Sequence, residues 1–400
     1  MGRVLGWVTC SVWLAAAVTG GRTVPDCAPT KPSEPPANIT RLHPAHVTAV
    51  LALGDSITAG MCAESSLREE RQMSWSGGEG DGAHLTLASL LGLYSGEIVG
   101  ASNASVYPAD IAHLPHGDYH PHTDNLNVAE SQAAVHLHSL EEQWALLEAA
   151  VQRQARSDAP GVFAARWKVL TVWMTANDLC SKGCGPSMAW APWPDFIASF
   201  TGLYENLLLN VTTHPLLKRT YINLMATPNL SAIKRLQEAR GGLCEAEHRL
   251  FLHECGCFSS SDPDALRNLD ANAGTLNQAL YDLADEFNAR LAAKGLAADY
   301  AVVTQPFLDG YSNFQDDFIN KLDCFHPSAV GHSLMAVGLF NSMLCTGDRS
   351  PEAMCGDPFS PTLQPVCPTA NAVFYTGPSP RQKNREQGPE PVLPWDGRSH

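Results

Sequence analysis

Short apolar runs alternate with longer amphipathic stretches along this 400-residue chain. Residues 47–53 are almost all apolar and show no helical spacing, which is typical of a strand buried on both faces of a parallel sheet. The same pattern predicts further strands at residues 167–174, 220–225 and 299–305, with a short one at 97–99.

Between these runs, apolar residues recur at intervals of three and four, which predicts helices. The expected helices cover residues 83–92, 132–156, 196–209, 265–294 and 328–343. Strands that alternate with helices indicate an α/β fold, a three-layer α/β/α sandwich around a mostly parallel sheet.

Candidate chemistry follows the first predicted strand. The chain turns at Gly54 and places the hydroxyl of Ser56 just past the carboxyl end of that strand, where open α/β sheets build their sites. The alternative is an ordinary strand-to-helix turn in which Ser56 is the N-cap of the helix.

Two polar residues near the other end of the chain favour the interpretation of Ser56 as part of a catalytic site. Asp323 precedes His326 by three residues, so one loop can supply a base and the acid that holds it. The order Ser, Asp, His along the chain is one of the orders in which catalytic triads occur.

With Asn177-Asp178 after a later strand, these motifs resemble those of the GDSL (SGNH) hydrolases. Longer pieces are similar to the phospholipase B branch of that family. They occur in order within residues 27–375, as Trp75-Ser-Gly-Gly-Glu-Gly-Asp81, Asn177-Asp-Leu-Cys180, Glu254-Cys-Gly-Cys-Phe258, Val303-Thr-Gln-Pro-Phe307 and Cys324-Phe-His-Pro327. The resemblance implies a flavodoxin-like, five-stranded sheet.

The resemblance also implies roles for individual residues. Ser56 would be the nucleophile, His326 its base and Asp323 the acid that orients the base. The oxyanion hole would be formed by the backbone N–H of Ser56, the backbone N–H of Ser131 and the side chain of Asn177. Ser131 stands where relatives usually carry glycine, and Ala176 replaces another glycine.

The expected substrates are fatty-acyl esters of glycerophospholipids and lysophospholipids, hydrolysed without a metal or organic cofactor. One alternative is a carbohydrate or small-ester esterase with the same triad. Another is a non-catalytic lipid-binding relative, which the two replaced glycines suggest and the intact Ser56, Asp323 and His326 argue against.

The beginning of the chain predicts export. Residues 1–21 carry one charge, Arg3, then a short apolar core and small residues, as in a cleaved signal peptide. A retained membrane anchor is the alternative, but the core is short for a bilayer span. Four N-glycosylation sequons, beginning at Asn38, Asn103, Asn210 and Asn229, fit a secreted protein.

The net charge of −15 argues against nucleic acid as a partner and against electrostatic capture by anionic membranes. Because the resemblance implies a lipid-ester substrate, we expect transient contact with lipid aggregates or a membrane surface, and the oligomeric state is left open. Residues 22–376 are predicted to form one hydrolase domain, and residues 377–400, rich in proline and charge, a disordered tail.

The chain has 12 cysteines, and eleven remain if Cys10 is removed with the signal peptide. An odd number in an oxidising compartment leaves one thiol, and Cys62 is the candidate because it belongs to no paired cluster. Cys180 and Cys184 are close enough in sequence to bridge, as are Cys345 and Cys355. Zinc is the alternative, with Cys180/Cys184 and Cys255/Cys257 as possible ligand pairs, although these spacings match no common zinc module and secretion favours bridges.

Four histidines gather among acidic residues in the segment 107–124, at positions 113, 116, 120 and 122. A metal site is one interpretation. We favour an exposed polar loop, because no helical or Cys-x-x-Cys frame fixes the geometry of these side chains.

Overall fold

The computed structural model describes residues 31–380, apart from residues 33, 65, 107–118, 186–187, 189–190, 243, 245–253 and 347–363. The predicted signal peptide, residues 381–400 of the predicted tail, His113 and His116 lie outside these ranges. His120 and His122 are exposed, as expected for a polar loop. The extent of the predicted domain stays a prediction.

Four parallel strands form the central sheet, in the order β1-β4-β5-β6. Their bounds are Val47–Gly54 for β1, Trp167–Trp173 for β4, Thr220–Met225 for β5 and Tyr300–Gln305 for β6. Nearly every residue in these strands is buried, because helices cover both faces of the sheet. The four longer strand predictions are confirmed.

The prediction of a fifth strand is wrong in its extent. Val99 forms only an isolated parallel bridge with Ala49 at the free edge of β1. The chain then turns away at Gly100, where a Cβ atom would lie 2.3 Å from the carbonyl oxygen of Val50. Asn127 pairs with Ala52 farther along the same edge. Two separate segments therefore share the place of one strand, and the second runs on past the carboxyl end of β1.

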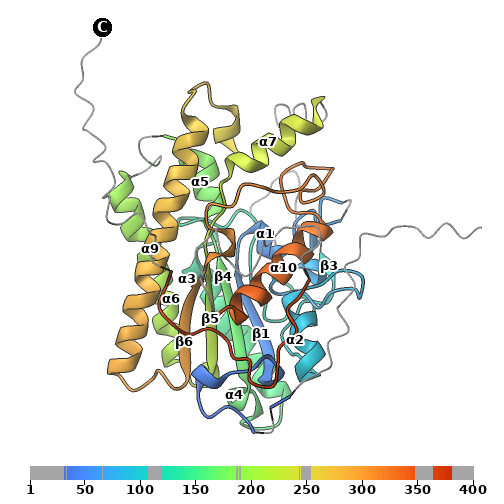
Figure 1. Ribbon diagram of the computed structural model, residues 1–400, viewed down its shortest axis with the longest axis vertical. Coiled ribbons are helices and arrows are strands. Elements are labelled where there is room, and N and C mark those ends of the chain that lie inside the picture. Colours follow the sequence, from blue (N-terminus) through green and yellow to red (C-terminus); the bar gives the residue numbers. More distant parts are fainter. Residues whose placement is uncertain are drawn as a thin grey trace, which may run out of the picture.

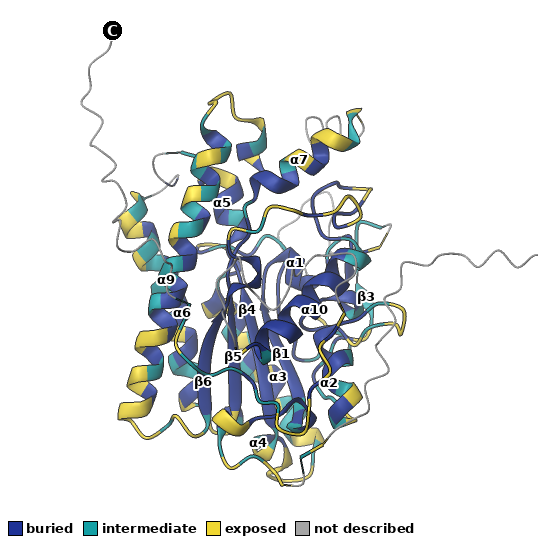
Figure 2. Ribbon diagram, viewed as in Figure 1, coloured by how far each residue is buried: buried dark blue, intermediate teal, exposed yellow. Residues whose placement is uncertain are grey.

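The helices form a layer on each side of the sheet (Figure 1). One layer consists of α3 (Leu140–Ser157), α6 (Trp193–Thr213) and α9 (Ala265–Ala293). The other consists of α2 (Leu87–Ser95) and α10 (Ala329–Leu344), and α10 is buried along nearly its whole length (Figure 2). The predicted three-layer α/β/α fold is confirmed.

The helix predicted from residue 132 begins later, at Leu140. Ser139 is its N-cap and forms a capping box with Glu142, which fixes the start of α3. The residues before Ser139 instead form a loop beside the end of β1, since Glu130 donates its backbone N–H to the carbonyl oxygen of Gly54 at 3.1 Å.

Shorter elements decorate the carboxyl edge and the rim of the sheet. They are α1 (Ser56–Ala59), the antiparallel pair β2 (Glu69–Glu70) and β3 (Ser105–Val106), α4 (Val162–Ala165), α5 (Ala176–Lys182), α7 (Ser231–Arg240) and the 3-10 turn η6 (Gly256–Ser259). The described helices include none with the length and apolar character that a bilayer crossing requires.

Three disulfides are described, Cys180–Cys255, Cys184–Cys257 and Cys244–Cys324. The predicted Cys180–Cys184 bridge is wrong, because both cysteines face η6 and each pairs across to it. Cys345 and Cys367 are also disulfide-bonded, but Cys355, the expected partner of Cys345, lies outside the described residues. Cys62 is a buried free cysteine, so the prediction of its unpaired thiol is confirmed.

Candidate active site

The turn after β1 positions Ser56. A Cβ atom at Gly54 would lie 2.3 Å from the carbonyl oxygen of Trp173, so only glycine allows β1 and β4 to end this close together. Asp55 is the N-cap of α1 and accepts a hydrogen bond from the backbone N–H of Ile57 at 3.0 Å. Ser56 is therefore the first residue of α1, and its interpretation as an N-cap is wrong.

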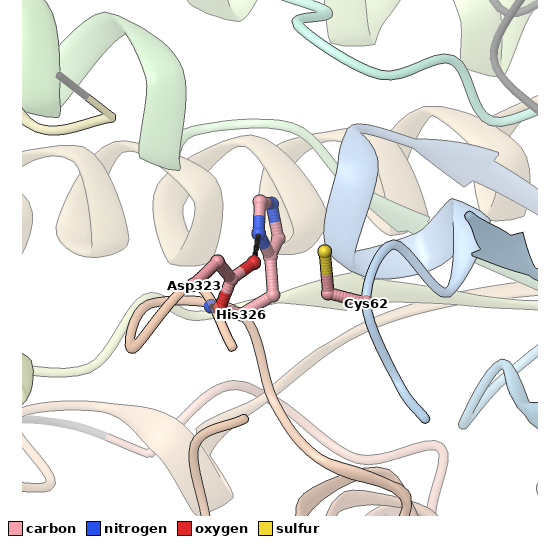
Figure 3. Close-up of side chains that lie close together, drawn as sticks. All are labelled: Cys62, Asp323 and His326. Carbon is pink, nitrogen blue, oxygen red and sulfur yellow. Dashed lines mark hydrogen bonds and ion pairs between the residues drawn. The ribbon is translucent and has the colours of Figure 1, made fainter. Parts of the chain in front are cut away.

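The loop before α10 brings two further predicted residues to Ser56. Nε2 of His326 lies 2.7 Å from Oγ of Ser56, and Nδ1 lies 2.7 Å from Oδ2 of Asp323. The other oxygen of Asp323 accepts the backbone N–H groups of Phe325 and His326, at 3.0 and 3.2 Å. Figure 3 shows Asp323 against the imidazole of His326, with Cys62 beside them. All three predicted triad residues are in hydrogen-bonded contact.

The three side chains are almost fully buried, with 7% of Ser56, 0% of Asp323 and 6% of His326 exposed. Burial alone would lower the pKa of His326, but the carboxylates of Glu254 and Asp323 outweigh it and raise the pKa. Burial would raise the pKa of Asp323, but the facing imidazole holds it below its usual range. The contact therefore favours an ionised Asp323 against a basic His326.

Asn177 is the second residue of α5, at the carboxyl end of β4. Its side-chain amide donates a hydrogen bond to the carbonyl oxygen of Ala133 at 3.0 Å, and the residue is partly exposed. Next to it, the buried carboxylate of Asp178 accepts the backbone N–H of Val135 at 3.1 Å. These two bonds fix residues 133–135 against the start of α5.

Ser131 lies in the same loop, and its side chain contacts β2. Its Oγ donates a hydrogen bond of 2.5 Å to Glu69, which pairs with Arg71 at 2.7 Å. Arg71 is fully buried and donates to the carbonyl oxygens of Asn127 and Ala129, at 3.1 and 2.8 Å. The sequence did not reveal the role of Glu69 and Arg71. Arg71 binds backbone carbonyl oxygens more than 50 residues later, and carbonyl groups carry no sequence signal.

The left-handed backbone conformation that favours glycine occurs at Gln132, with φ of 67°, and not at Ser131. Relatives are expected to carry glycine at position 131. In this chain the backbone conformation that favours glycine lies one residue later, at Gln132. The sequence carries no signal for it, since a glutamine at positive φ looks like any other glutamine.

A parallel α/β sheet with a hydrogen-bonded Ser-His-Asp group at its carboxyl edge has the arrangement of a serine hydrolase. A family model described as GDSL-like lipase/acylhydrolase matches residues 50–339. The chain therefore belongs to the GDSL-like lipase/acylhydrolase family, whose members are carboxylic-ester hydrolases.

The chain is also similar to individual proteins that are named as phospholipases. Residues of this chain are 28% identical to the rat protein named phospholipase B1, membrane-associated, over 337 residues, and 26% identical to its human counterpart over 345 residues. Each alignment covers 80% of this chain but only 20% or 21% of the relative. The chain thus spans about a fifth of the length of these relatives.

Proposed function

We propose that this protein is a secreted serine esterase that hydrolyses fatty-acyl ester bonds of glycerophospholipids and lysophospholipids. The observation that carries the proposal is the continuous contact from Ser56 through His326 to Asp323, with 2.7 Å at each step. A nucleophile, its base and the acid that orients the base are the groups that acyl transfer to water requires.

In the proposed mechanism, Nε2 of His326 takes the proton of Ser56 as Oγ bonds to the ester carbonyl carbon. Asp323 fixes the imidazole with its proton on Nδ1 and stabilises the imidazolium that forms. The protonated His326 then gives its proton to the leaving alkoxide, and the ester C–O bond breaks. Water, activated by the same imidazole, hydrolyses the acyl-Ser56 ester and frees the fatty acid.

Three donors would meet the oxyanion of the tetrahedral intermediate. They are the backbone N–H of Ser56, the backbone N–H of Ser131 and the side-chain amide of Asn177. The amide nitrogen of Asn177 carries two hydrogens, so its bond to Ala133 leaves one for the substrate. The network of Glu69 and Arg71 supports this assignment, because it holds the backbone just before Ser131 and the hydroxyl of Ser131 itself.

Apolar rings beside the triad support a fatty-acyl substrate. The ring of Phe325 lies edge-on to His326 with centroids 5.2 Å apart, and Phe258 packs on Phe325 at 6.1 Å. The names of the similar proteins give the substrate class, phospholipids. Secretion is supported by the disulfides, which form in oxidising compartments.

The substrate proposal is tested by assaying the purified protein on a phospholipid, the matching lysophospholipid and a soluble short-chain ester. The expected result is a higher kcat/KM on the two lipids, with release of free fatty acid. Turnover of the short-chain ester alone would indicate a small-ester esterase. Lipid binding without turnover of any of the three would contradict an enzymatic function.

A further inference from the structure

A second carboxylate lies beside the imidazole of His326. Oε2 of Glu254 is 3.6 Å from Nδ1, the nitrogen that Asp323 also faces. The side chain of Glu254 is only 16% exposed, and this Oε2 has no hydrogen-bond partner among the described residues. Burying a carboxylate without a hydrogen bond is unfavourable. The compensation available at this position is the charge of a protonated His326.

Covalent bonds hold Glu254 in this place. The next residue, Cys255, is bridged to Cys180 on α5, and Cys257 is bridged to Cys184 just after α5. On the other side, Phe258 packs against Phe325, the neighbour of His326. The segment 254–258 is therefore fixed between the helix that carries Asn177 and the loop that carries the imidazole.

Other titratable groups also surround His326. Asp323 lies on its own loop, Asp55 on the turn before α1, the thiol of Cys62 on the segment after α1, and His332 on α10. Of these, Asp55 accepts the backbone N–H of Ile57 with Oδ1 as the N-cap of α1, while its buried Oδ2 has no hydrogen-bond partner among the described residues. Burial lowers the pKa of His332 to about 3, so that it is uncharged near neutral pH. Asp323 and Glu254 are the two carboxylates that face Nδ1.

We propose that Glu254 is a positioning residue of this site, a second carboxylate that stabilises the protonated form of His326 during acyl transfer. The inference rests on the proposed function, because it concerns the base of that mechanism. When the Oγ–H bond of Ser56 breaks and the proton moves to Nε2, the imidazole gains a positive charge. Two carboxylates then face that charge instead of one, which strengthens His326 as a base.

The protonation of Glu254 is linked to that of His326. Burial raises the pKa of Glu254, and the attraction of the charged His326 opposes the rise. Glu254 therefore ionises more readily when the imidazole is charged, and each charge stabilises the other.

The direct test is an NMR titration of the His326 imidazole in a Ser56→Ala background, with Glu254, with Glu254→Gln and with Glu286→Gln. Glu286 is an exposed residue of α9 and serves as the matched control. Removing the charge of Glu254 is expected to lower the pKa of His326 by about one pH unit. Glu286→Gln is expected to leave it unchanged. An unchanged pKa in folded Glu254→Gln protein would overturn the proposal.

Kinetics of the enzyme with Ser56 intact provide the second measurement. Glu254→Gln is expected to move the acid limb of kcat/KM to lower pH and to reduce kcat on the order of tenfold, with KM unchanged. Glu254→Asp keeps the charge and should restore part of both effects. If Glu254→Gln does not fold, Glu254→Asp replaces it in the titration and should lower the pKa of His326 by less.

The two proposals fail separately. Hydrolysis that survives Ser56→Ala would remove the mechanism as a whole. An unmoved His326 pKa and an unmoved acid limb, in an enzyme that still depends on Ser56, would remove only the role of Glu254.

Discussion

Individual side chains of the site are held by partners that take no part in the proposed chemistry. The amide of Asn177 is fixed by the carbonyl oxygen of Ala133, and the hydroxyl of Ser131 is fixed by Glu69. Such contacts orient a donor before the substrate arrives, so that little reorganisation is needed in the transition state.

Asn177→Ala is expected to lower kcat by roughly 100- to 1,000-fold, about 3–4 kcal/mol, and to change KM much less. The reason is that an oxyanion donor acts on charge that exists only in the transition state. Asn272→Ala is the matched control, because its amide also donates to a backbone carbonyl, that of Gly183, but from α9. Steady-state kinetics on one lipid ester give kcat and KM for both variants. Equal effects of the two substitutions would mean that Asn177 is only structural.

Gln132→Gly is expected to keep or raise stability, because glycine removes a left-handed strain of about 1–2 kcal/mol and loses about 0.5–1 kcal/mol in chain entropy. Gln132→Val places a β-branched residue at the same φ and should lower the free energy of unfolding. Urea unfolding of both variants measures this difference. A glycine variant as unstable as the valine variant would show that Gln132 does not adopt this conformation.

At the scale of elements, four chain segments meet at the carboxyl edge of the sheet, and the sequence predicted them unequally. The turn after β1 and the loop before α10 carry local motifs, so Ser56, Asp323 and His326 could be placed from sequence. The contacts that support the loop at 127–133 could not be predicted from sequence, because Arg71 donates its hydrogen bonds to backbone carbonyl oxygens of that loop. Its backbone geometry was also out of reach, since positive φ at Gln132 depends on tertiary contacts.

The start of α5 gives a pH-dependent prediction. Burial raises the pKa of Asp178 to about 7, although the bond from Val135 opposes the rise. A carboxyl with a raised pKa stabilises the fold below its unfolded pKa of about 4, and this contribution is lost as pH rises to about 7. Asparagine does not ionise, so the Asp178→Asn variant does not lose stability at this position as the pH rises.

The free energy of unfolding of Asp178→Asn, relative to the native protein, should therefore increase between pH 4 and 7, on the order of 1–3 kcal/mol. Asp195→Asn, at an exposed position in the first turn of α6, should show no such trend. Denaturant unfolding at several pH values provides the comparison. A difference that stays constant with pH would mean that Asp178 is ionised throughout this range.

At the scale of the whole molecule, disulfides connect parts of the chain 73 to 80 residues apart and converge on the site. Cys244–Cys324 adjoins Asp323, and the other two bridges tie α5 to η6. Sequence spacing favoured the short Cys180–Cys184 bridge, because proximity along the chain was the only guide to pairing. The layers, in contrast, followed from the alternation of buried strands and amphipathic helices, which is set locally.

Thiol counting under denaturing, non-reducing conditions is expected to give one thiol per secreted chain, at Cys62. The Cys62→Ser variant should then give none, which serves as the control. Mass spectrometry of alkylated peptides identifies the position. Several free thiols, or an alkylation site other than Cys62, would contradict the disulfide assignment.

The most direct measurement of the central claim is the kcat of purified Ser56→Ala on a lysophospholipid, beside the native protein and Ser76→Ala. Ser76 is the control, because its buried hydroxyl has no hydrogen-bond partner among the described residues. We predict that Ser56→Ala folds with an unchanged melting temperature and loses on the order of a million-fold in kcat, while Ser76→Ala stays active. Hydrolysis by folded Ser56→Ala at the native rate would contradict the account.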